Sequence, residues 1–239
     1  MCGRAVVPRR AMSARAVRPP IRSAMVRPTL VIMAKQPRMG QVKTRLGRDV
    51  GAVRATAFYR TNLATLLARL GSDRRWDTVL AVTPDTRIAG AGWPTPAGRI
   101  RRSPQRLGDL GQRMQRQLDR RFERRRCGPV LIVGTDIPSI RPTHIAAAFA
   151  ALGKRQAVFG PSPDGGFWLV GQRRRPRLLK LFDDVRWSSA ETLADCLRHI
   201  GAADVALTSM LPDIDSGAEL AAVSSWFGRL VLPHNVGRT

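Results

Sequence analysis

Apolar residues occur along the chain in two patterns that alternate from residue 29 onward. Strands are predicted where apolar residues run without interruption, at residues 30–34, 78–82, 130–133, 157–159, 167–170 and 205–207. Helices are predicted where apolar residues recur every three or four positions, at residues 51–70, 108–126, 142–152, 188–199 and 218–227. Unbroken apolar runs are typical of strands whose two faces are both buried. We therefore expect an α/β fold, a single domain with a mostly parallel sheet and helices on both faces.

Individual residues refine some of these helices. Pro142 suits the first position of a helix, where its missing amide hydrogen leaves no bond unmade. The sequence Ser188-Ser189-Ala190-Glu191 has the spacing of a capping box, which predicts Ser188 as the N-cap of the following helix. On the helix of residues 108–126, the side that we expect to face solvent carries Arg113, Arg116, Arg120 and Arg124.

Basic residues dominate the charge, because 41 lysines and arginines against 17 acids give a net charge of +24. Such a charge is typical of proteins that bind nucleic acid. One alternative is therefore a non-catalytic protein that grips phosphates with Arg124–Arg126 and Arg173–Arg175. However, only four of the basic residues are lysines, a bias that indicates codon composition, and no helix-turn-helix, RNP or zinc-finger pattern is present. A nucleic-acid partner is not the favoured interpretation.

The first 28 residues differ from the rest of the chain, with seven arginines and no acid. They contain no apolar core of the length that a secretion signal has. The segment resembles a transit peptide and also an overlong gene start, with Met12 and Met25 as possible initiators. We favour a disordered tail or a misassigned start, and we expect the folded domain to span residues 29–239.

The remaining composition excludes several classes of protein. A chain that is 44% hydrophobic can bury a core, which argues against disorder. No apolar run approaches the ~20 residues of a membrane helix. Three cysteines and three histidines are dispersed without ligand spacing, so neither a disulfide framework nor a zinc site is expected. We expect a reducing, cytoplasmic location.

The candidate chemistry lies in the segments that follow the strands, because ligands of parallel α/β sheets bind beyond the carboxyl ends of the strands. The segment after the first strand supplies Lys35, Lys43 and Arg45, and Gly40 permits a tight turn. Fixed cations and backbone amides near a glycine suit a phosphate chain, although the P-loop pattern is absent. An ordinary basic loop is the alternative.

Acids follow two later strands. Asp136 ends the strand at 130–133, where a carboxylate is well placed to hold Mg²⁺ or Mn²⁺ against a diphosphate. A helix cap is the alternative at this position. Asp213 and Asp215 stand after the strand at 205–207.

Residues 160–168 combine a carboxylate, two glycines and aromatic rings. Asp164 is followed by Gly165 and Gly166, which allow a substrate to approach the backbone closely. Phe167 or Trp168 is a candidate to face a sugar or a base. A plain glycine-rich turn is the alternative.

Five motifs occur in a fixed order. They are K-x-P-x-x-G-x-V-K-T-R-L at 35–46, G-x-D-x-P at 134–138, G-P-x-x-D-G-G-[FY] at 160–167, F-x-x-V-x-W-S at 182–188 and D-I-D-S at 213–216. Together they resemble the small bacterial GT-A-type glycosyltransferase family, which includes a group associated with arsenosugar biosynthesis. The chain is more distantly similar to 2-phospholactate guanylyltransferase and sugar-nucleotide nucleotidyltransferases. The resemblance covers about residues 29–220 and implies a GT-A-like fold that binds a nucleotide-activated donor with a divalent metal.

The resemblance also implies roles for the residues that match the motifs. Those implied in nucleotide binding are Lys35, Pro37, Gly40, Lys43, Thr44 and Arg45. Those implied in binding Mg²⁺ or Mn²⁺ are Asp136 and Asp215. Those implied on the substrate side are Asp164, Gly165, Gly166, Phe167 and Trp187. Among them, Lys43, Arg45 and Asp164 are expected to be catalytic. The chain departs from the family pattern at two positions, where Phe167 replaces a common Tyr and Arg141 replaces a Ser or Thr cap.

Two reactions fit these residues. In glycosyl transfer, a small acceptor attacks the sugar of a nucleoside-diphosphate-sugar and a nucleoside diphosphate leaves. In nucleotidyl transfer, a phosphorylated substrate attacks the α-phosphate of a nucleoside triphosphate and pyrophosphate leaves. The resemblance favours glycosyl transfer, while a protein that binds the donor without turnover is a third alternative.

Overall fold

The structure, a computed structural model, describes residues 26–94, 100–123, 127–198 and 200–224. Within these residues, a seven-stranded sheet has the order β3-β2-β1-β4-β6-β5-β7. Along the chain the strands are β1 (Thr29–Lys35), β2 (Asp77–Thr83), β3 (Arg101–Pro104), β4 (Val130–Val133), β5 (Ala157–Pro161), β6 (Phe167–Gln172) and β7 (Val205–Leu207). In this sheet of described residues, only β6 runs antiparallel to its neighbours, β4 and β5. The mostly parallel sheet is confirmed.

The described residues include one helix that the sequence did not predict, and another helix begins later than predicted. They are α1 (Thr44–Val50), α2 (Ala52–Gly71), α3 (Leu110–Phe122), α4 (Pro142–Lys154), α5 (Thr192–Arg198) and α6 (Gly217–Ser224), with short 3₁₀ turns η1 (Asp85–Arg87) and η2 (Ala202–Asp204). The helix α1 and the strand β3 were not predicted. The sequence of β3, Arg-Arg-Ser-Pro, has no apolar run, because this strand lies at the edge of the sheet and needs little burial.

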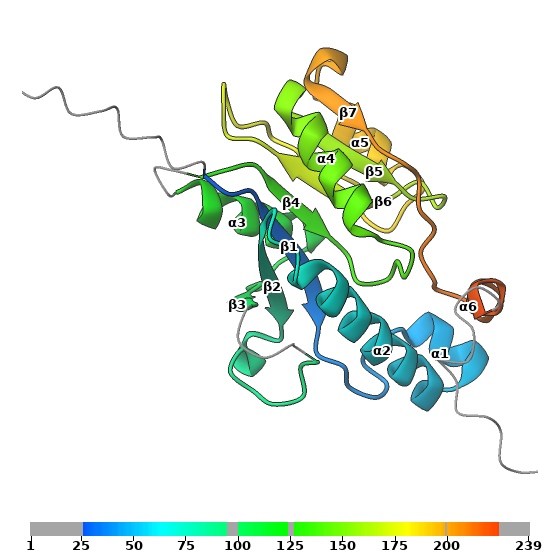
Figure 1. Cartoon of the computed structure of the whole chain (residues 1–239). Helices are drawn as coiled ribbons and strands as arrows, with labels where there is room; N and C mark the ends of the chain where they lie inside the picture. Colours follow the sequence, from blue (N-terminus) through cyan, green and yellow to red (C-terminus); the bar gives the residue numbers. More distant parts are fainter. Residues whose placement is uncertain (1–25, 95–99, 124–126, 199, 225–239) are drawn as a thin grey trace, which may run out of the picture.

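The helices cover both faces of the sheet, which confirms the predicted three-layer arrangement (Figure 1). On one face, side chains of α2 and α4 pack against the sheet. On the other face, the sheet packs against α3 and α5. The helices α1 and α6 lie side by side near the end of the sheet where β1 and β2 terminate (Figure 1).

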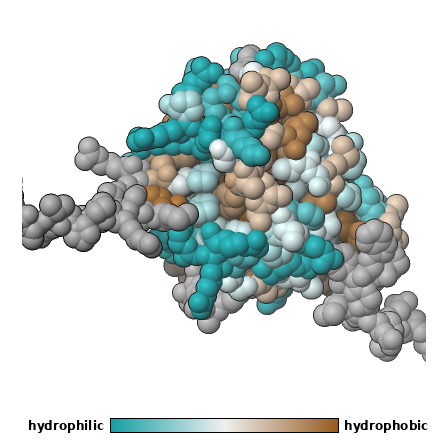
Figure 2. Space-filling view, turned by 45° about the horizontal axis from the view of Figure 1, so that its top comes forward, coloured by the Kyte–Doolittle hydropathy of each residue, from teal (hydrophilic) through white to brown (hydrophobic). Residues whose placement is uncertain are grey.

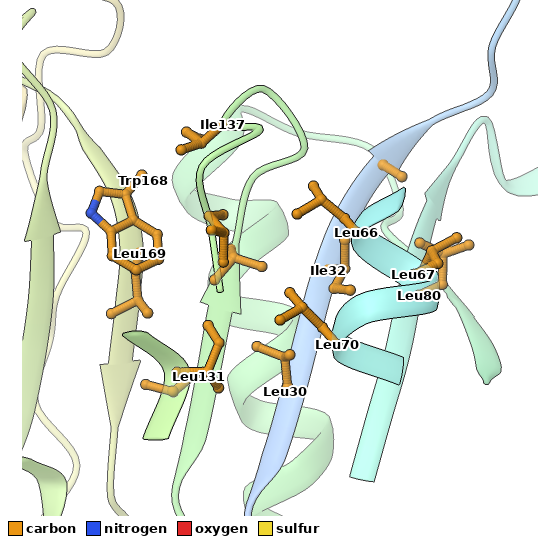
Figure 3. Packing of buried hydrophobic residues seen from close by; sticks show 14 of the residues in the cluster. Leu30, Ile32, Leu66, Leu67, Leu70, Leu80, Leu131, Ile137, Trp168 and Leu169 are labelled. Atoms are coloured by element: carbon orange, nitrogen blue, oxygen red, sulfur yellow. The ribbon is translucent and has the colours of Figure 1, made fainter. Parts of the chain in front are cut away.

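Leucines of α2 show why the sequence folds in this way. Leu66 and Leu70 point from α2 toward Leu30 and Ile32 of β1 (Figure 3), and all four are fully buried. Because the strand carries apolar residues on both faces, it packs on helices from both sides. Truncation of a core leucine such as Leu66 to alanine is expected to cost about 2–5 kcal/mol of stability.

The directions of the strands place the predicted site segments at one edge of the sheet. Parallel strands β1, β2, β4 and β5 end at the same edge. The strand β6 starts there too, because it pairs with β5 in a hairpin whose turn covers residues 162–166. The carboxyl ends and the glycine-rich turn therefore meet.

Hydrophilic residues cover much of the face in Figure 2, and the apolar patches between them are small. In the described part of the chain, no helix is both long enough and apolar enough to span a bilayer. The predicted tail falls almost wholly outside the described residues, as do Arg124–Arg126 and the end of the last predicted helix.

Candidate functional site

A cavity of about 700 Å³ opens at the edge of the sheet where the parallel strands end. Its volume lies within the range of small-molecule sites. Its lining combines residues from segments far apart in the sequence. Of the residues predicted for a site, those that line the cavity are Lys35, Lys43, Thr44, Arg45, Asp136, Asp164, Gly166, Phe167, Trp168, Trp187 and Asp215.

Lys43 joins two of the predicted acids in this cavity. Its ammonium nitrogen lies 3.1 Å from Oδ1 of Asp136 and 2.6 Å from Oδ1 of Asp215. The Lys43 side chain is only 4% exposed, whereas the two carboxylates are 44% and 38% exposed. Lys43 and Asp215 are 172 positions apart in the sequence, so only the folded chain brings them together. The two carboxylates converge on a single cation.

Backbone and side-chain hydrogen bonds hold Asp215 in this position. The amide of Ile214 donates to the carbonyl oxygen of Asp136 at 3.1 Å, which joins the two acidic segments directly. The Glu219 carboxylate accepts from the amides of Asp215 and Ser216, each at 2.7 Å. Since the Ser216 hydroxyl accepts in turn from the Glu219 amide, these residues form a capping box at the start of α6.

A buried tyrosine holds the ends of β1 and β4 together. The hydroxyl of Tyr59 on α2 donates to the carbonyl oxygen of Lys35 and accepts from the Lys35 amide. It also receives a hydrogen bond from the Thr135 hydroxyl, and Asn62 donates to the Thr135 carbonyl oxygen at 2.6 Å. Burial raises the pKa of Tyr59 to about 12, and the Asp136 charge adds to that increase. The residue before Asp136 is thus fixed from α2.

The loop before α1 brings the cationic side chains to the cavity. Lys43 is the N-cap of α1 and has a left-handed backbone (φ 48°, ψ 49°), a conformation that costs a residue with a side chain about 1–2 kcal/mol. Arg45 extends to 3.5 Å from Oδ2 of Asp215 and is 72% exposed. Gly40 supports the turn with φ +72°. The predicted residues Pro37 and Gly40 shape this loop but do not line the cavity.

The turn between β5 and β6 presents Asp164 at the cavity. Its Oδ1 accepts a hydrogen bond from the amide of Gly166 at 2.9 Å, which orients the carboxylate. Gly165 does not line the cavity but has φ +82°, and a β-carbon there would lie 2.0 Å from the Ala190 carbonyl oxygen. Only glycine therefore allows this turn to pack against the segment that carries Trp187.

Aromatic rings form one wall of the cavity. Trp187 packs edge to face with Phe167, at a centroid distance of 6.4 Å, and against Phe182 at 6.1 Å. Gly111 of α3 approaches Trp187 so closely that a β-carbon would lie 2.5 Å from the indole ring. Trp168, the other candidate, is 2% exposed and donates its indole N–H to the Ser209 carbonyl oxygen at 3.0 Å. Phe167 and Trp187 are therefore the more accessible rings.

The segment that carries Trp187 is fixed by a buried carboxylate. The side chain of Asp195 on α5 is 1% exposed and accepts two hydrogen bonds from the Arg186 guanidinium and one from the Arg186 amide. Arg198 also pairs with it. The hydrogen bonds from Arg186, against a smaller opposing effect of burial, hold the pKa of Asp195 well below its usual range.

The predicted capping role of Ser188 was wrong. The helix α5 begins at Thr192 rather than at residue 189, and Ser188 has a left-handed backbone (φ +58°) and lines the cavity. The Thr192 hydroxyl donates to the carbonyl oxygens of Arg186 and Ser189. This local network turns the chain before the helix can start.

Several cavity residues were missed by the sequence analysis, among them Gln105, Leu110 and Arg113 at or near the start of α3. Gln105 is 3% exposed and donates to the carbonyl oxygens of Ala34 and Ala81. Arg113 was predicted to face solvent, but it lines the cavity and donates to the backbone oxygen of Asp109. Gln105 directly follows β3, so a prediction of β3 as a strand would have marked this polar residue as a candidate for the site.

Asp213 also lines the cavity. Its pKa is raised by burial and by the nearby charges of Asp164 and Asp215. The carboxylates therefore share a confined region in which a bound cation would reduce their mutual repulsion.

The carboxylates of Asp136 and Asp215 suit a divalent cation whose remaining ligands are water and substrate oxygens. Within the described residues, no group of three or more histidine, cysteine or acidic side chains is arranged to hold a metal. Asp136 and Asp215 nevertheless converge on one cation, the Lys43 ammonium. Mg²⁺ is commonly held by one or two carboxylates together with water and substrate phosphates.

The arginines of the nucleic-acid alternative lie elsewhere. Arg173–Arg175 follow β6, which starts at the cavity edge and ends at the opposite edge of the sheet. The Arg173 side chain donates to the Gly153 carbonyl oxygen. The described arginine block is thus separate from the acids that line the cavity.

Solved structures share this architecture. A protein from Desulfovibrio desulfuricans G20 named a "putative nucleotide-diphospho-sugar transferase" is 26% identical and superposes with a TM-score of 0.77, covering 86% of this chain and 90% of its own. The 4-diphosphocytidyl-2C-methyl-D-erythritol synthase of Anaerococcus prevotii DSM 20548 is 12% identical, with a TM-score of 0.54 and coverage of 84% and 98%. No curated protein matches the sequence significantly.

These similarities confirm the predicted fold, that of the nucleotide-diphospho-sugar transferases, and support an enzyme of the transferase class that uses a nucleotide. A family model matches residues 66–189, just over half of the chain, and thereby includes β2, β3 and β4 and the turn with Asp164. The chain belongs to the family described as "Uncharacterized protein conserved in bacteria (DUF2064)".

Proposed function

We propose that the protein is a metal-dependent glycosyltransferase that moves a sugar from a nucleoside-diphosphate-sugar to a small acceptor. The observation that carries this proposal is the meeting of Asp136 and Asp215 on one buried cation, Lys43, inside a cavity of about 700 Å³. Two carboxylates and a cation are the groups that a diphosphate and its metal require. The domain of residues 29–239 would carry the activity.

The donor would occupy the side of the cavity beyond the end of β1. Lys35, Thr44 and Arg45 line this side, and charged or hydroxyl donors bind phosphate oxygens well. Asp136 and Asp215 would hold Mg²⁺ or Mn²⁺, which when bound neutralises charge on the diphosphate. Lys43 and Arg45 would donate hydrogen bonds to the leaving phosphate oxygen and stabilise its negative charge.

The acceptor would occupy the side that Asp164, Phe167 and Trp187 line. Asp164 would accept the proton of the acceptor hydroxyl as its oxygen forms a bond to the anomeric carbon. The bond between that carbon and the donor phosphate oxygen breaks, and the nucleoside diphosphate leaves. The aromatic wall would orient the acceptor and exclude water.

The same groups would also support nucleotidyl transfer, in which pyrophosphate leaves instead. The relative from Desulfovibrio desulfuricans, named as a nucleotide-diphospho-sugar transferase, favours the glycosyl reaction. To distinguish the two, the protein is incubated with Mg²⁺ or Mn²⁺ and a panel of nucleotide-sugars and nucleoside triphosphates. Release of a nucleoside diphosphate supports the proposal, and release of pyrophosphate replaces it with the alternative. Donor binding without turnover for every acceptor in the panel would contradict both reactions.

A further inference from the structure

The position of Lys43 raises a problem for the proposed metal site. Its ammonium lies 2.6 Å and 3.1 Å from the two carboxylate oxygens that a divalent cation would need. The side chain is 4% exposed, so the charge has lost most of its contact with water. A metal ion binds carboxylate oxygens at about 2.0–2.1 Å, and two cations between the same oxygens would repel one another strongly.

The remaining contacts of the two carboxylates do not remove this problem. Arg45 is the further cation near Asp215, but it lies at 3.5 Å and is 72% exposed. Lys43 lies close to both Asp136 and Asp215. Its left-handed backbone at the start of α1 turns its side chain toward these two carboxylates. No cluster of three or more acidic, histidine or cysteine side chains offers the metal another place in the described residues.

We propose that Lys43 is an internal substitute for the divalent cation, so that its ammonium and the metal compete for Asp136 and Asp215. This inference rests on the proposed function, because the diphosphate of the donor is the group that would release Lys43. Phosphate oxygens form short, charge-assisted hydrogen bonds with an ammonium. When Lys43 moves to the diphosphate, both carboxylates become available to the metal.

Metal and donor therefore bind cooperatively. Each favours the state in which Lys43 has left the carboxylates, and by linkage each raises the affinity of the other by the same factor. Without a donor, the metal must displace a cation that is already paired. The competition between Lys43 and the metal keeps the charges of Asp136 and Asp215 neutralised in the free protein. Tight metal binding therefore depends on the donor.

The test is the affinity for Mn²⁺ alone, measured by electron paramagnetic resonance of free Mn²⁺ on the full chain. Lys43→Met should bind Mn²⁺ roughly tenfold or more tightly than the wild type, within the usual range of coupling between sites. Lys180→Met is the matched control, because Lys180 is an exposed lysine that pairs with Asp183 and does not line the cavity. Its Mn²⁺ affinity should equal that of the wild type.

A simple structural role for the ion pairs predicts the opposite result. If Lys43 only holds the two acidic segments in place, its removal should leave Mn²⁺ binding unchanged or weaken it, and either outcome would overturn the inference. Lys43→Gln provides a second neutral variant should Lys43→Met unfold, as judged by circular dichroism. The double variant Lys43→Met/Asp136→Asn should lose the gained affinity, and retention of it would also overturn the inference.

The outcomes separate this inference from the proposed function. Turnover of a nucleotide-sugar by the wild type together with unchanged Mn²⁺ affinity in Lys43→Met would leave the function standing and overturn the competition. A gain in Mn²⁺ affinity without turnover of any donor would support the competition and contradict the function.

Discussion

The amide of Ile214 donates a hydrogen bond to the carbonyl oxygen of Asp136 at 3.1 Å. This bond ties the segment after β7 to the segment after β4, and the side chains of Asp136 and Asp215 consequently reach the same Lys43 ammonium. The candidate site is therefore assembled by the backbone as well as by charge. Substitutions that leave the backbone intact should change the chemistry without unfolding the protein.

Replacement of Asp164 tests the proposed proton acceptor. Asp164→Asn keeps an oxygen for the hydrogen bond from Gly166 but cannot accept the proton of the acceptor hydroxyl. We expect turnover to fall by about 10²–10⁴-fold, the usual contribution of a general base, with little change in donor affinity. Initial rates and donor titration measure the two effects. Asp183→Asn is the control, because Asp183 is an exposed loop residue. Its turnover and donor affinity should equal those of the wild type.

Replacement of Trp187 tests the aromatic wall. Trp187→Ala removes the ring that packs against Phe167 and Phe182. The KM for the acceptor should rise roughly tenfold or more, which corresponds to about 1.4 kcal/mol of lost contact. In the proposed arrangement the donor occupies the other side of the cavity, so its affinity should not change. A larger effect on the donor than on the acceptor would contradict the assignment of the two sides.

Asp195 should make the protein sensitive to acid. Its pKa is lower in the folded state than in the unfolded state, so the stability that it contributes is fully present above the ordinary aspartate pKa of 3.8 and is lost as the pH falls below that value. Urea denaturation of the wild type and of Asp195→Asn should differ at neutral pH. The difference should shrink as the pH falls below about 4. A difference independent of pH would show that the charge of Asp195 is not the cause.

Tyr59 allows a direct measurement, because it is the single tyrosine of the chain. Burial raises its pKa from 10.0 to about 12, so the stability linked to its neutral form is complete below pH 10 and is lost as the pH rises through 12. The absorbance of tyrosinate should therefore appear only near pH 12 in the folded protein. Tyr59→Phe should cost about 1–3 kcal/mol at neutral pH, because it leaves backbone groups of Lys35 without their partner.

Gly165 should tolerate no side chain. A β-carbon there would lie 2.0 Å from the Ala190 carbonyl oxygen, and the φ of +82° is itself unfavourable for other residues. Gly165→Ala should lower the free energy of unfolding by about 3 kcal/mol. Gly153→Ala is the matched control, since a β-carbon at this position in α4 would meet no atom within 4 Å beyond its neighbours and the adjacent helix backbone. The control should be neutral or slightly stabilising.

Much of this site could be predicted from the order of strands and loops. Asp136, Asp164 and Asp215 follow or flank strands, and the rule that carboxyl ends of parallel strands meet at one edge is enough to bring them together. The contact between Lys43 and both acids was not predicted, because Lys43 was expected to face a phosphate chain. A left-handed residue before a seven-residue helix has no apolar periodicity to reveal it.

The errors have two physical origins. The strand β3 lies at an edge, carries polar residues and so lacks the apolar run that marks a buried strand. Without β3, the cavity residue Gln105 had no predicted place, whereas Arg113 was predicted on the solvent side of its helix although it lines the cavity. Ser188 had the spacing of a cap, but the tertiary contacts of Arg186 with Asp195 override that local preference.

The role of Asp136 decides the central claim, that two carboxylates hold the metal of a nucleotide-dependent transferase. The measurement is the release of nucleoside diphosphate from a nucleotide-sugar, as a function of Mn²⁺ concentration, by the wild type and Asp136→Asn. Asp73→Asn is the control, because Asp73 pairs with Arg75 and does not line this cavity. We predict Mn²⁺-dependent release by the wild type and the control, and a loss of about 10²-fold or more in Asp136→Asn. Full Mn²⁺-dependent activity in Asp136→Asn would contradict the account.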